Sequence, residues 1–214
     1  MDLVLVGLSW SGKSAVGRRL SRRHEATFVD IDEEIERAAG RPIPSIFSEE
    51  GEPGFRASER RAIEALGPAD SRPGMTHVIA TGGGATVDPR NRWHLYSGRM
   101  AAWLDAPPEI LAQRVRNSPV PRPLLSGRDP VATMRGLATT RAAFYGAALR
   151  VNGIVGLAGI VETLERHLDD PIPDGTLLLR ATTPLGLYEL VDGTAAAGVV
   201  AALVGLEARR AILV

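Results

Sequence analysis

"GLSWSGKSAVG", residues 7–17, is the stretch that decides how this chain folds. It matches the pattern G-x-x-x-x-G-K-[ST], with Gly7, Gly12, Lys13 and Ser14 at the fixed positions. The apolar run "DLVLV" precedes it and an amphipathic, arginine-rich segment follows it, which is the order strand, glycine loop, helix. In such a loop the backbone N–H groups and the positive end of the helix dipole wrap a phosphate group. The stretch therefore predicts a phosphate-binding loop after the first strand.

Lys13 is the only lysine among the 25 basic residues of the chain, and all the others are arginine. A compact ammonium reaches back to the terminal phosphates inside the loop, where a guanidinium serves less well. We expect Lys13 to balance charge on the β- and γ-phosphates of ATP and the Ser14 hydroxyl to bind Mg²⁺. The other nucleotide contacts in the loop are expected from Ser9, Trp10, Ser11, Gly12 and Ala15.

Trp10 stands in the middle of the loop, where a small or turn-tolerant residue would be easier to accommodate. If its backbone needs a positive φ, an indole there costs on the order of 1–2 kcal/mol relative to glycine. It removes no N–H group from the phosphate cradle. We expect its side chain to point away from the phosphates, toward solvent or toward a segment that closes over the nucleotide.

Composition sets the class of protein. A chain of 214 residues with 44% hydrophobic residues predicts one α/β domain with a short appendage. The formal net charge of zero argues against a broad nucleic-acid or anionic-membrane surface. The absence of cysteine excludes disulfides, thiolate metal sites and cysteine nucleophiles. No apolar run has membrane-spanning length and no signal peptide is evident, so we expect a cytoplasmic monomer without nucleic-acid or membrane partners.

Strand-like and helix-like segments alternate along residues 1–170. Alternation of this kind predicts right-handed crossovers and a P-loop NTPase-like parallel sheet flanked by helices, as in nucleoside-monophosphate kinases. Ligands on such sheets bind at the carboxyl ends of the strands. The expected strands are 2–6, 26–32, the start of 76–86, 99–107 and 150–156, and the expected helices are 13–24, 33–40, 42–51, 55–67, 107–116, 131–149 and 157–168.

Residues 171–214 differ in character and are expected to form a short α/β extension. Strand-like "TLLLRAT" and "LYELVDG" flank the turn "TPLG", and an Ala/Val/Gly-rich helix and the apolar "RRAILV" follow. The chain is thus divided into a domain at 1–170 and an extension at 171–214.

Acidic residues follow the second expected strand. Asp30 and Asp32 in "VDID" are two residues apart, so on a strand both carboxylates would point to one side. There they could steady Mg²⁺ through water and accept a proton from a substrate hydroxyl. The alternative is that one of them caps the next helix.

Basic residues and glycines offer further alternatives. Arg56 and Glu59 share a helix face, either as a surface ion pair or as a fork for a substrate carboxylate that the glutamate holds in place. Gly82, Gly83 and Gly84 allow a close backbone approach to a ligand or make a simple sharp turn. In the Pro-rich loop 117–130 and the helix after it, Arg122 and Arg141 are either solvated arginines or ligands of anionic groups.

The chain resembles shikimate kinase over about residues 2–168. The matching segments are "GLSWSGKSAVGRRL", "FVDIDEEIERAAGRPIPSIFSEEGEPGFRASE", "TGGGAT", "WLDAPPEILAQRV", "RPLL" and "RAAFY". The resemblance implies ATP- and Mg²⁺-dependent phosphorylation of the 3-hydroxyl of shikimate, in the pathway to aromatic amino acids. The alternatives are another small-molecule kinase, such as a gluconate kinase, or a nucleotide-binding module without turnover.

The resemblance also implies roles for the candidate residues. Asp32 would bind the shikimate hydroxyls and assist deprotonation, and Asp30 would support the Mg²⁺ water shell. Arg56, Arg141 and the glycines at 82–84 would bind shikimate. Arg122 would be the catalytic arginine of a lid at 117–130, and Arg116 (or Arg114) would pack against adenine.

Two features depart from the family pattern. Trp10 replaces a usual glycine, and Pro119 and Pro121 should stiffen the lid. Residues 171–214 do not match shikimate kinase; "RATTPLGLYELVDG" and "ARRAILV" resemble the first strands of dehydroquinate synthase.

Overall fold

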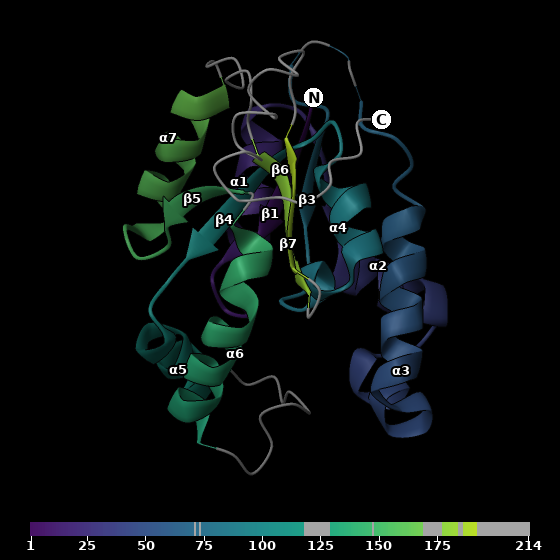
Figure 1. The fold of residues 1–214 in the computed structure, drawn as a ribbon. Coiled ribbons are helices and arrows are strands. Elements are labelled where there is room, and N and C mark those ends of the chain that lie inside the picture. Colours follow the sequence, from purple (N-terminus) through teal and green to yellow (C-terminus); the bar gives the residue numbers. More distant parts are fainter. Residues whose placement is uncertain are drawn as a thin grey trace.

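One parallel sheet organises the molecule. The computed structural model describes residues 1–70, 72, 74–117, 129–146 and 148–168, and the backbone of 177–183 and 186–191. Five parallel strands lie in the order β2-β3-β1-β4-β5 (Figure 1). They are β1 (Asp2–Val6), β2 (Thr27–Asp30), β3 (His77–Ala80), β4 (Met100–Asp105) and β5 (Leu149–Asn152). The predicted parallel sheet flanked by helices is confirmed.

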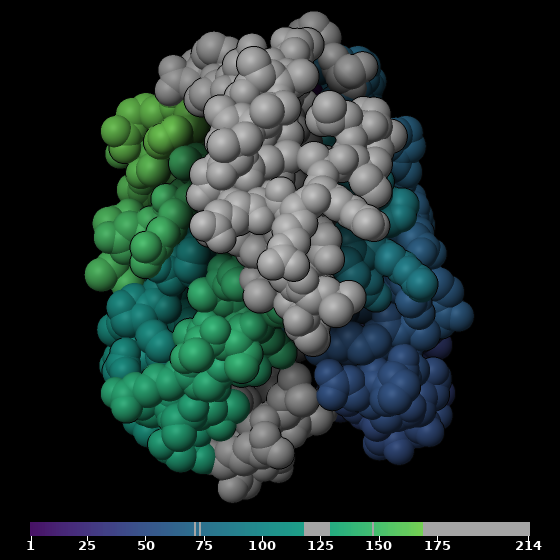
Figure 2. Space-filling view, in the orientation of Figure 1, coloured from purple at the N-terminus to yellow at the C-terminus, as the bar shows by residue number. Residues whose placement is uncertain are grey.

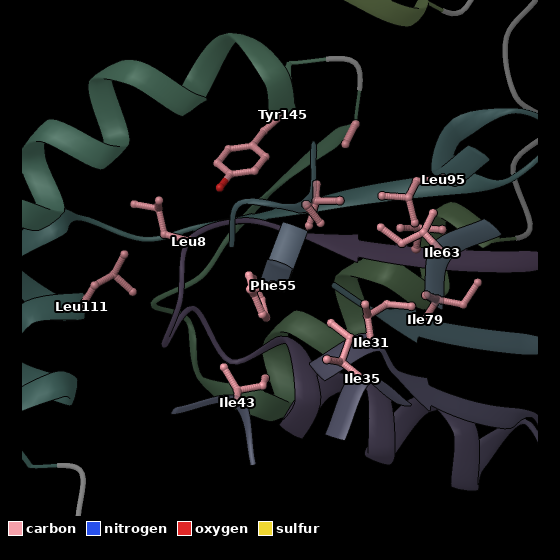
Figure 3. Packing of buried hydrophobic residues seen from close by; sticks show 14 of the residues in the cluster. Leu8, Ile31, Ile35, Ile43, Phe55, Ile63, Ile79, Leu95, Leu111 and Tyr145 are labelled. Atoms are coloured by element: carbon pink, nitrogen blue, oxygen red, sulfur yellow. The ribbon is translucent and has the colours of Figure 1, made fainter. Parts of the chain in front are cut away.

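Helices cover both faces of this sheet. Successive side chains of β1 therefore point alternately into two hydrophobic cores, one on each face. Leu3 and Leu5 pack with residues of α1 and α7, whereas Val4 and Val6 belong to the core under α2 to α6. Figure 3 shows part of the second core, with Ile31, Ile35, Ile63 and Ile79 close together. The helices are α1 (Lys13–Arg23), α2 (Ile31–Ala39), α3 (Ile43–Glu64), α4 (Pro89–Tyr96), α5 (Pro108–Arg116), α6 (Pro130–Tyr145) and α7 (Gly156–Leu168).

Several element boundaries differ from the sequence-based expectations. The strand expected at 150–156 is β5, which ends at Asn152, and the helix expected at 131–149 is α6, which ends at Tyr145. The strand expected at 26–32 ends at Asp30, because the Asp30 side chain accepts a hydrogen bond from the Asp32 N–H and caps α2. The two helices expected at 42–51 and 55–67 are confirmed: they follow one another within α3, separated at Gly51, whose backbone (φ 69°, ψ −172°) is not helical. The 3₁₀ helix η1 (Ala85–Val87) and α4 were not predicted.

The extension contains an antiparallel pair, β6 (Leu177–Thr183) and β7 (Gly186–Val191), which confirms the two strands expected there. The helix expected after them lies outside the described residues. The same holds for most of the expected lid, including Pro119, Pro121 and Arg122. Among the helices that the structure describes, none is long and apolar enough to cross a membrane.

Candidate functional site

The glycine loop joins β1 to α1 with the geometry of a phosphate cradle. Gly7 and Gly12 have φ values of 132° and 98°, and Gly12 precedes the first helical residue, Lys13. A Cβ atom on Gly7 would lie 2.8 Å from the Leu104 carbonyl oxygen, so only glycine fits there. No described side chain caps α1, so the N–H groups of its first turn face the loop without a side-chain acceptor. Such a helix start is suited to an anion.

Lys13 is buried within the curve of the loop, with 7% of its surface exposed. Its Nζ donates hydrogen bonds to the Gly7 carbonyl at 2.9 Å and the Leu8 carbonyl at 2.7 Å. The Ser11 hydroxyl lies 3.3 Å from the same nitrogen. The ammonium therefore folds back over the loop, and its charge lies within the curve of the loop.

Oxygen ligands suited to Mg²⁺ lie beside the loop. The Ser14 hydroxyl donates to Asp30 Oδ2 at 2.6 Å, while Asp30 Oδ1 caps α2. Within the described part of the chain, no group of three or more His, Cys, Asp or Glu residues could hold a metal. Mg²⁺ beside a nucleotide binds through one or two protein oxygens and the phosphates, and the Ser14 hydroxyl and the Asp30 carboxylate are oxygen ligands of this kind. Ser14 and Asp30 thus fit the ion.

Asp32 is separated from Asp30 by the start of α2. It lies in the first turn of the helix, so the expectation that both carboxylates project from one side of a strand is wrong. The physical reason is that the Asp30 side chain satisfies the Asp32 N–H, which favours helix over strand at Ile31. The two acids therefore serve different places: Asp30 lies at the loop and Asp32 lines a neighbouring pocket.

The pocket that Asp32 lines, called the acceptor pocket below, lies next to the glycine loop, because Ser9 and Trp10 of the loop also line it. Figures 1 and 2 show α3 and α6 on opposite sides of the lower half of the molecule, and the pocket takes residues from both. It brings together many of the residues predicted from the sequence. The pocket is lined by Ser9, Trp10, Asp32, Ile43, Phe47, Phe55, Arg56, Glu59, Gly82, Gly83, Gly84, Met134, Leu137 and Arg141.

Arg56 and Glu59 form a pocket ion pair rather than a surface pair. Arg56 Nη1 donates to Glu59 Oε2 at 2.8 Å, and the carboxylate is 1% exposed. Burial raises the pKa of Glu59, Arg56 lowers it in part, and the nearby Asp32 charge raises it again. Glu59 Oε1 has no hydrogen-bond partner among the described residues. The buried Glu59 carboxylate and the partly exposed Asp32 carboxylate thus lie on this side of the pocket, with the Arg56 guanidinium beside Glu59.

The three glycines leave room for these side chains. A Cβ atom on Gly82 would lie 2.9 Å from Glu59 Oε1 and 3.1 Å from Asp32 Oδ1. On Gly84 it would lie 2.7 Å from an Arg56 nitrogen. The segment is therefore a point of close approach and not merely a sharp turn.

Arg141 and Tyr145 hold the glycine segment from α6. Arg141 Nη1 donates to the Gly83 carbonyl at 2.9 Å, and the Tyr145 hydroxyl donates to the same oxygen. Burial raises the pKa of Tyr145 to about 12, so the phenol remains a neutral donor at neutral pH. Tyr145 was not among the predicted residues, although its position four residues after Arg141 puts both on one helix face.

The two arginines of α5 lie in different surroundings. Arg114 Nη1 donates to the Trp10 carbonyl at 2.9 Å, and its Nη2 to the Gly153 carbonyl at 3.3 Å. Arg116 is exposed and lies 3.9 Å from Asp129. Of the two, it is Arg114 that contacts the glycine loop.

Trp10 has a φ of 63°, as expected for a strained loop position. Its indole is partly buried, lines the acceptor pocket and packs against the core under α2 to α6. The expectation that it points to solvent is wrong, because the pocket offers apolar surface to the ring. Its expected alternative, packing under the lid, concerns residues outside the described part.

Comparisons with known proteins identify the family of this chain. The family model for shikimate kinase matches residues 10–152. A shikimate kinase of Symbiobacterium thermophilum is 45% identical over 152 residues, 71% of this chain and 84% of that protein. One from Caulobacter vibrioides is 47% identical over 146 residues, covering 68% and 70%.

Solved structures give the same result. A shikimate kinase from Acinetobacter baumannii in complex with shikimate superposes with a TM-score of 0.69 at 34% identity, covering 80% of this chain and 95% of that one. The Bacteroides thetaiotaomicron enzyme gives a TM-score of 0.71 at 26% identity, covering 79% and 98%. The family model, the similar sequences and the similar structures together show that this chain belongs to the shikimate kinase family.

Proposed function

We propose that the acceptor pocket binds shikimate while the glycine loop binds ATP, and that the γ-phosphoryl group passes directly to the 3-hydroxyl. As a shikimate kinase family member, the chain is an ATP-dependent kinase. The observation that carries the proposal is the position of the pocket: a cavity with two arginines and two carboxylates lies beside a preformed phosphate cradle. Direct transfer needs little besides such positioning and charge.

In the proposed complex, Arg56 and Arg141 bind the shikimate carboxylate. A guanidinium suits this task because its N–H groups match a carboxylate in pairs. Glu59 keeps Arg56 in place through their ion pair, and Arg141 is steadied by its hydrogen bond to Gly83. Gly82, Gly83 and Gly84 let the substrate approach the backbone. The apolar residues of the pocket exclude water and so strengthen these charge interactions.

Asp32 is proposed to bind the hydroxyl groups of shikimate and to take the proton of the attacking one. A carboxylate can do so when it lies within hydrogen-bond reach of the hydroxyl. Asp32 lines the acceptor pocket beside the glycine segment, and the resemblance to shikimate kinase assigns this role to Asp32 rather than to the buried Glu59.

The nucleotide side of the proposal uses the loop from Ser9 to Ala15. Lys13 would stabilise the charge that develops on the transferred group, and Arg116 would pack against adenine. Arg122, outside the described residues, would add a second cation from the lid. Ser14 and Asp30 would hold Mg²⁺, which supplies positive charge to the phosphates when bound.

We further infer that residues 1–170 carry the activity and that 171–214 form an extension derived from the start of a dehydroquinate synthase-like domain. The resemblance of "RATTPLGLYELVDG" to that enzyme supports this assignment. We also propose that the protein is a cytoplasmic monomer. The zero net charge supports the part of this proposal that excludes nucleic-acid and membrane partners.

Rates of ADP release test the function. The full chain with ATP and Mg²⁺ is expected to release ADP on addition of shikimate and not of gluconate. A response to gluconate alone would make it a different kinase, and ATP binding without turnover would make it a binding module. The same assay on residues 1–170 should give an unchanged rate per folded molecule; a large loss would assign the extension a part in the activity.

Replacing Tyr145 by phenylalanine is expected to lower the free energy of unfolding by about 1 kcal/mol and Tm by about 2–4 °C. The change removes one of the two donors to the Gly83 carbonyl, so KM for shikimate should rise as well. Tyr96→Phe is the matched control, because the Tyr96 hydroxyl donates to the Phe144 carbonyl away from the pocket. The control should lose similar stability in a thermal melt and keep its KM. An equal KM in both variants would contradict the role of Tyr145.

A further inference from the structure

Trp10 belongs to the phosphate loop and also lines the acceptor pocket. We propose that Trp10 is a specificity-determining residue, whose indole forms the wall of the acceptor pocket on the loop side and restricts the pocket to compact cyclic acids. The inference rests on the proposed function, since it takes the pocket as the shikimate site. Its first support is that the indole both lines the pocket and packs against the core.

The backbone of Trp10 is held in the conformation that directs the side chain there. Its φ of 63° lies in the left-handed region, which a tryptophan rarely adopts. Arg114 binds the Trp10 carbonyl from α5. On the other side, a Cβ atom on Gly83 would lie 2.9 Å from the Ser9 nitrogen, so the loop packs directly on the glycine segment. Contacts on both sides thus maintain an unfavourable conformation, which is typical of positions with a function.

The surroundings of the indole indicate what it contacts. Phe47 and Phe55 stack on α3 with their ring centres 4.6 Å apart, and Met134 and Leu137 come from α6. These apolar side chains line the same pocket as the arginines and carboxylates. A cyclic hydroxy acid presents polar groups at its edge and carbon at its ring faces. The indole would cover such a ring face and exclude water from it. With glycine at position 10, the wall would be open and a bulkier acceptor would fit.

Steady-state kinetics of the full chain test this. Trp10→Gly should raise KM for shikimate about tenfold, the effect of losing apolar contact in a substrate pocket. KM for ATP should change by less than about twofold, because the loop N–H groups remain. Trp10→Phe keeps an aromatic wall and should lie between glycine and wild type. Trp93→Phe is the matched control, since Trp93 lies on α4, is 51% exposed and does not line the pocket.

Specificity provides the second readout. Quinate is a cyclic acid with one more hydroxyl group than shikimate. The ratio of kcat/KM for quinate to kcat/KM for shikimate should rise when Trp10 is replaced by glycine. An unchanged shikimate KM with an unchanged quinate-to-shikimate ratio would overturn the inference. An equal rise in KM for shikimate and in KM for ATP would also overturn the inference, because Trp10 would then act on nucleotide binding as well.

A fluorescence titration keeps the test independent of the glycine variant. In the Trp93→Phe chain, shikimate should change the tryptophan emission, and adding Trp10→Phe should remove most of that change. Retention of the full change would contradict the placement of the indole in the site. If the wild-type chain does not turn over shikimate, the proposed function itself fails, an outcome distinct from those of the variants.

Discussion

Replacing Lys13 by methionine is expected to lower kcat for shikimate phosphorylation by about 10³-fold or more, since one preorganised charge at a developing phosphate charge has an effect of this order. Lys13 is the only lysine of the chain, and its ammonium already lies inside the loop. Methionine keeps the length of the apolar stem and removes the charge. Initial rates at saturating shikimate and ATP measure the loss.

The structural cost of this change must be separated from the catalytic one. Without the ammonium, the carbonyls of Gly7 and Leu8 lose a hydrogen-bond donor. If water does not reach them, the free energy of unfolding falls by about 1–3 kcal/mol. Circular dichroism and a thermal melt show how much of the variant is folded. Arg18→Met is the matched control, because Arg18 is an exposed cation on the same helix, paired with Glu33. A folded Lys13→Met variant with normal turnover would refute the phosphate-loop assignment.

Replacing Asp32 by asparagine is expected to lower kcat by about 10²–10⁴-fold, the usual contribution of a positioned general base. The amide has the same shape but cannot accept the proton of the attacking hydroxyl. The cap of α2 should be kept in this variant, because it uses the Asp32 backbone N–H and the Asp30 side chain. Steady-state rates over a range of shikimate concentrations separate kcat from KM.

A stability measurement and a control variant separate the catalytic effect of Asp32→Asn from a structural one. The Asp32 charge is one cause of the raised pKa of buried Glu59, after burial, and a thermal melt of the variant shows whether a loss of activity comes from unfolding. Glu33→Gln is the control, because Glu33 is the next residue of α2 but is exposed and paired with Arg18. If Asp32→Asn keeps the wild-type kcat and only KM rises, Asp32 binds shikimate without acting as a base.

The elements that could be predicted from sequence are those with local causes. The order of strand, glycine loop and helix follows from the spacing of Gly7, Gly12 and Lys13, and the observed α1 begins at Lys13 as expected. Gly40 ends α2 in the left-handed conformation, which a terminal glycine predicts. The parallel sheet follows from the alternation of apolar runs and amphipathic segments.

The sequence left questions open, or led to a wrong expectation, where the outcome depends on which group a side chain contacts. A strand continuing through Asp32 and a helix capped by Asp30 both agree with "VDID", and a single hydrogen bond decides between them. Arg56 and Glu59 read equally well as a surface pair until the packing of α3 buries the carboxylate. Tyr145 gains its role only because α6 crosses the glycine segment at Gly83.

The sequence by itself determined the parallel α/β fold, the phosphate loop and the shikimate kinase family, since these depend on residue types at fixed short spacings. Only the tertiary structure decided that Asp30 and Asp32 serve different sites, that Glu59 is buried beside Arg56, and that the Trp10 indole lines the acceptor pocket. The reason is physical. Burial, charge pairing and the direction of a side chain are set by residues far apart in the chain, which only the folded molecule brings together.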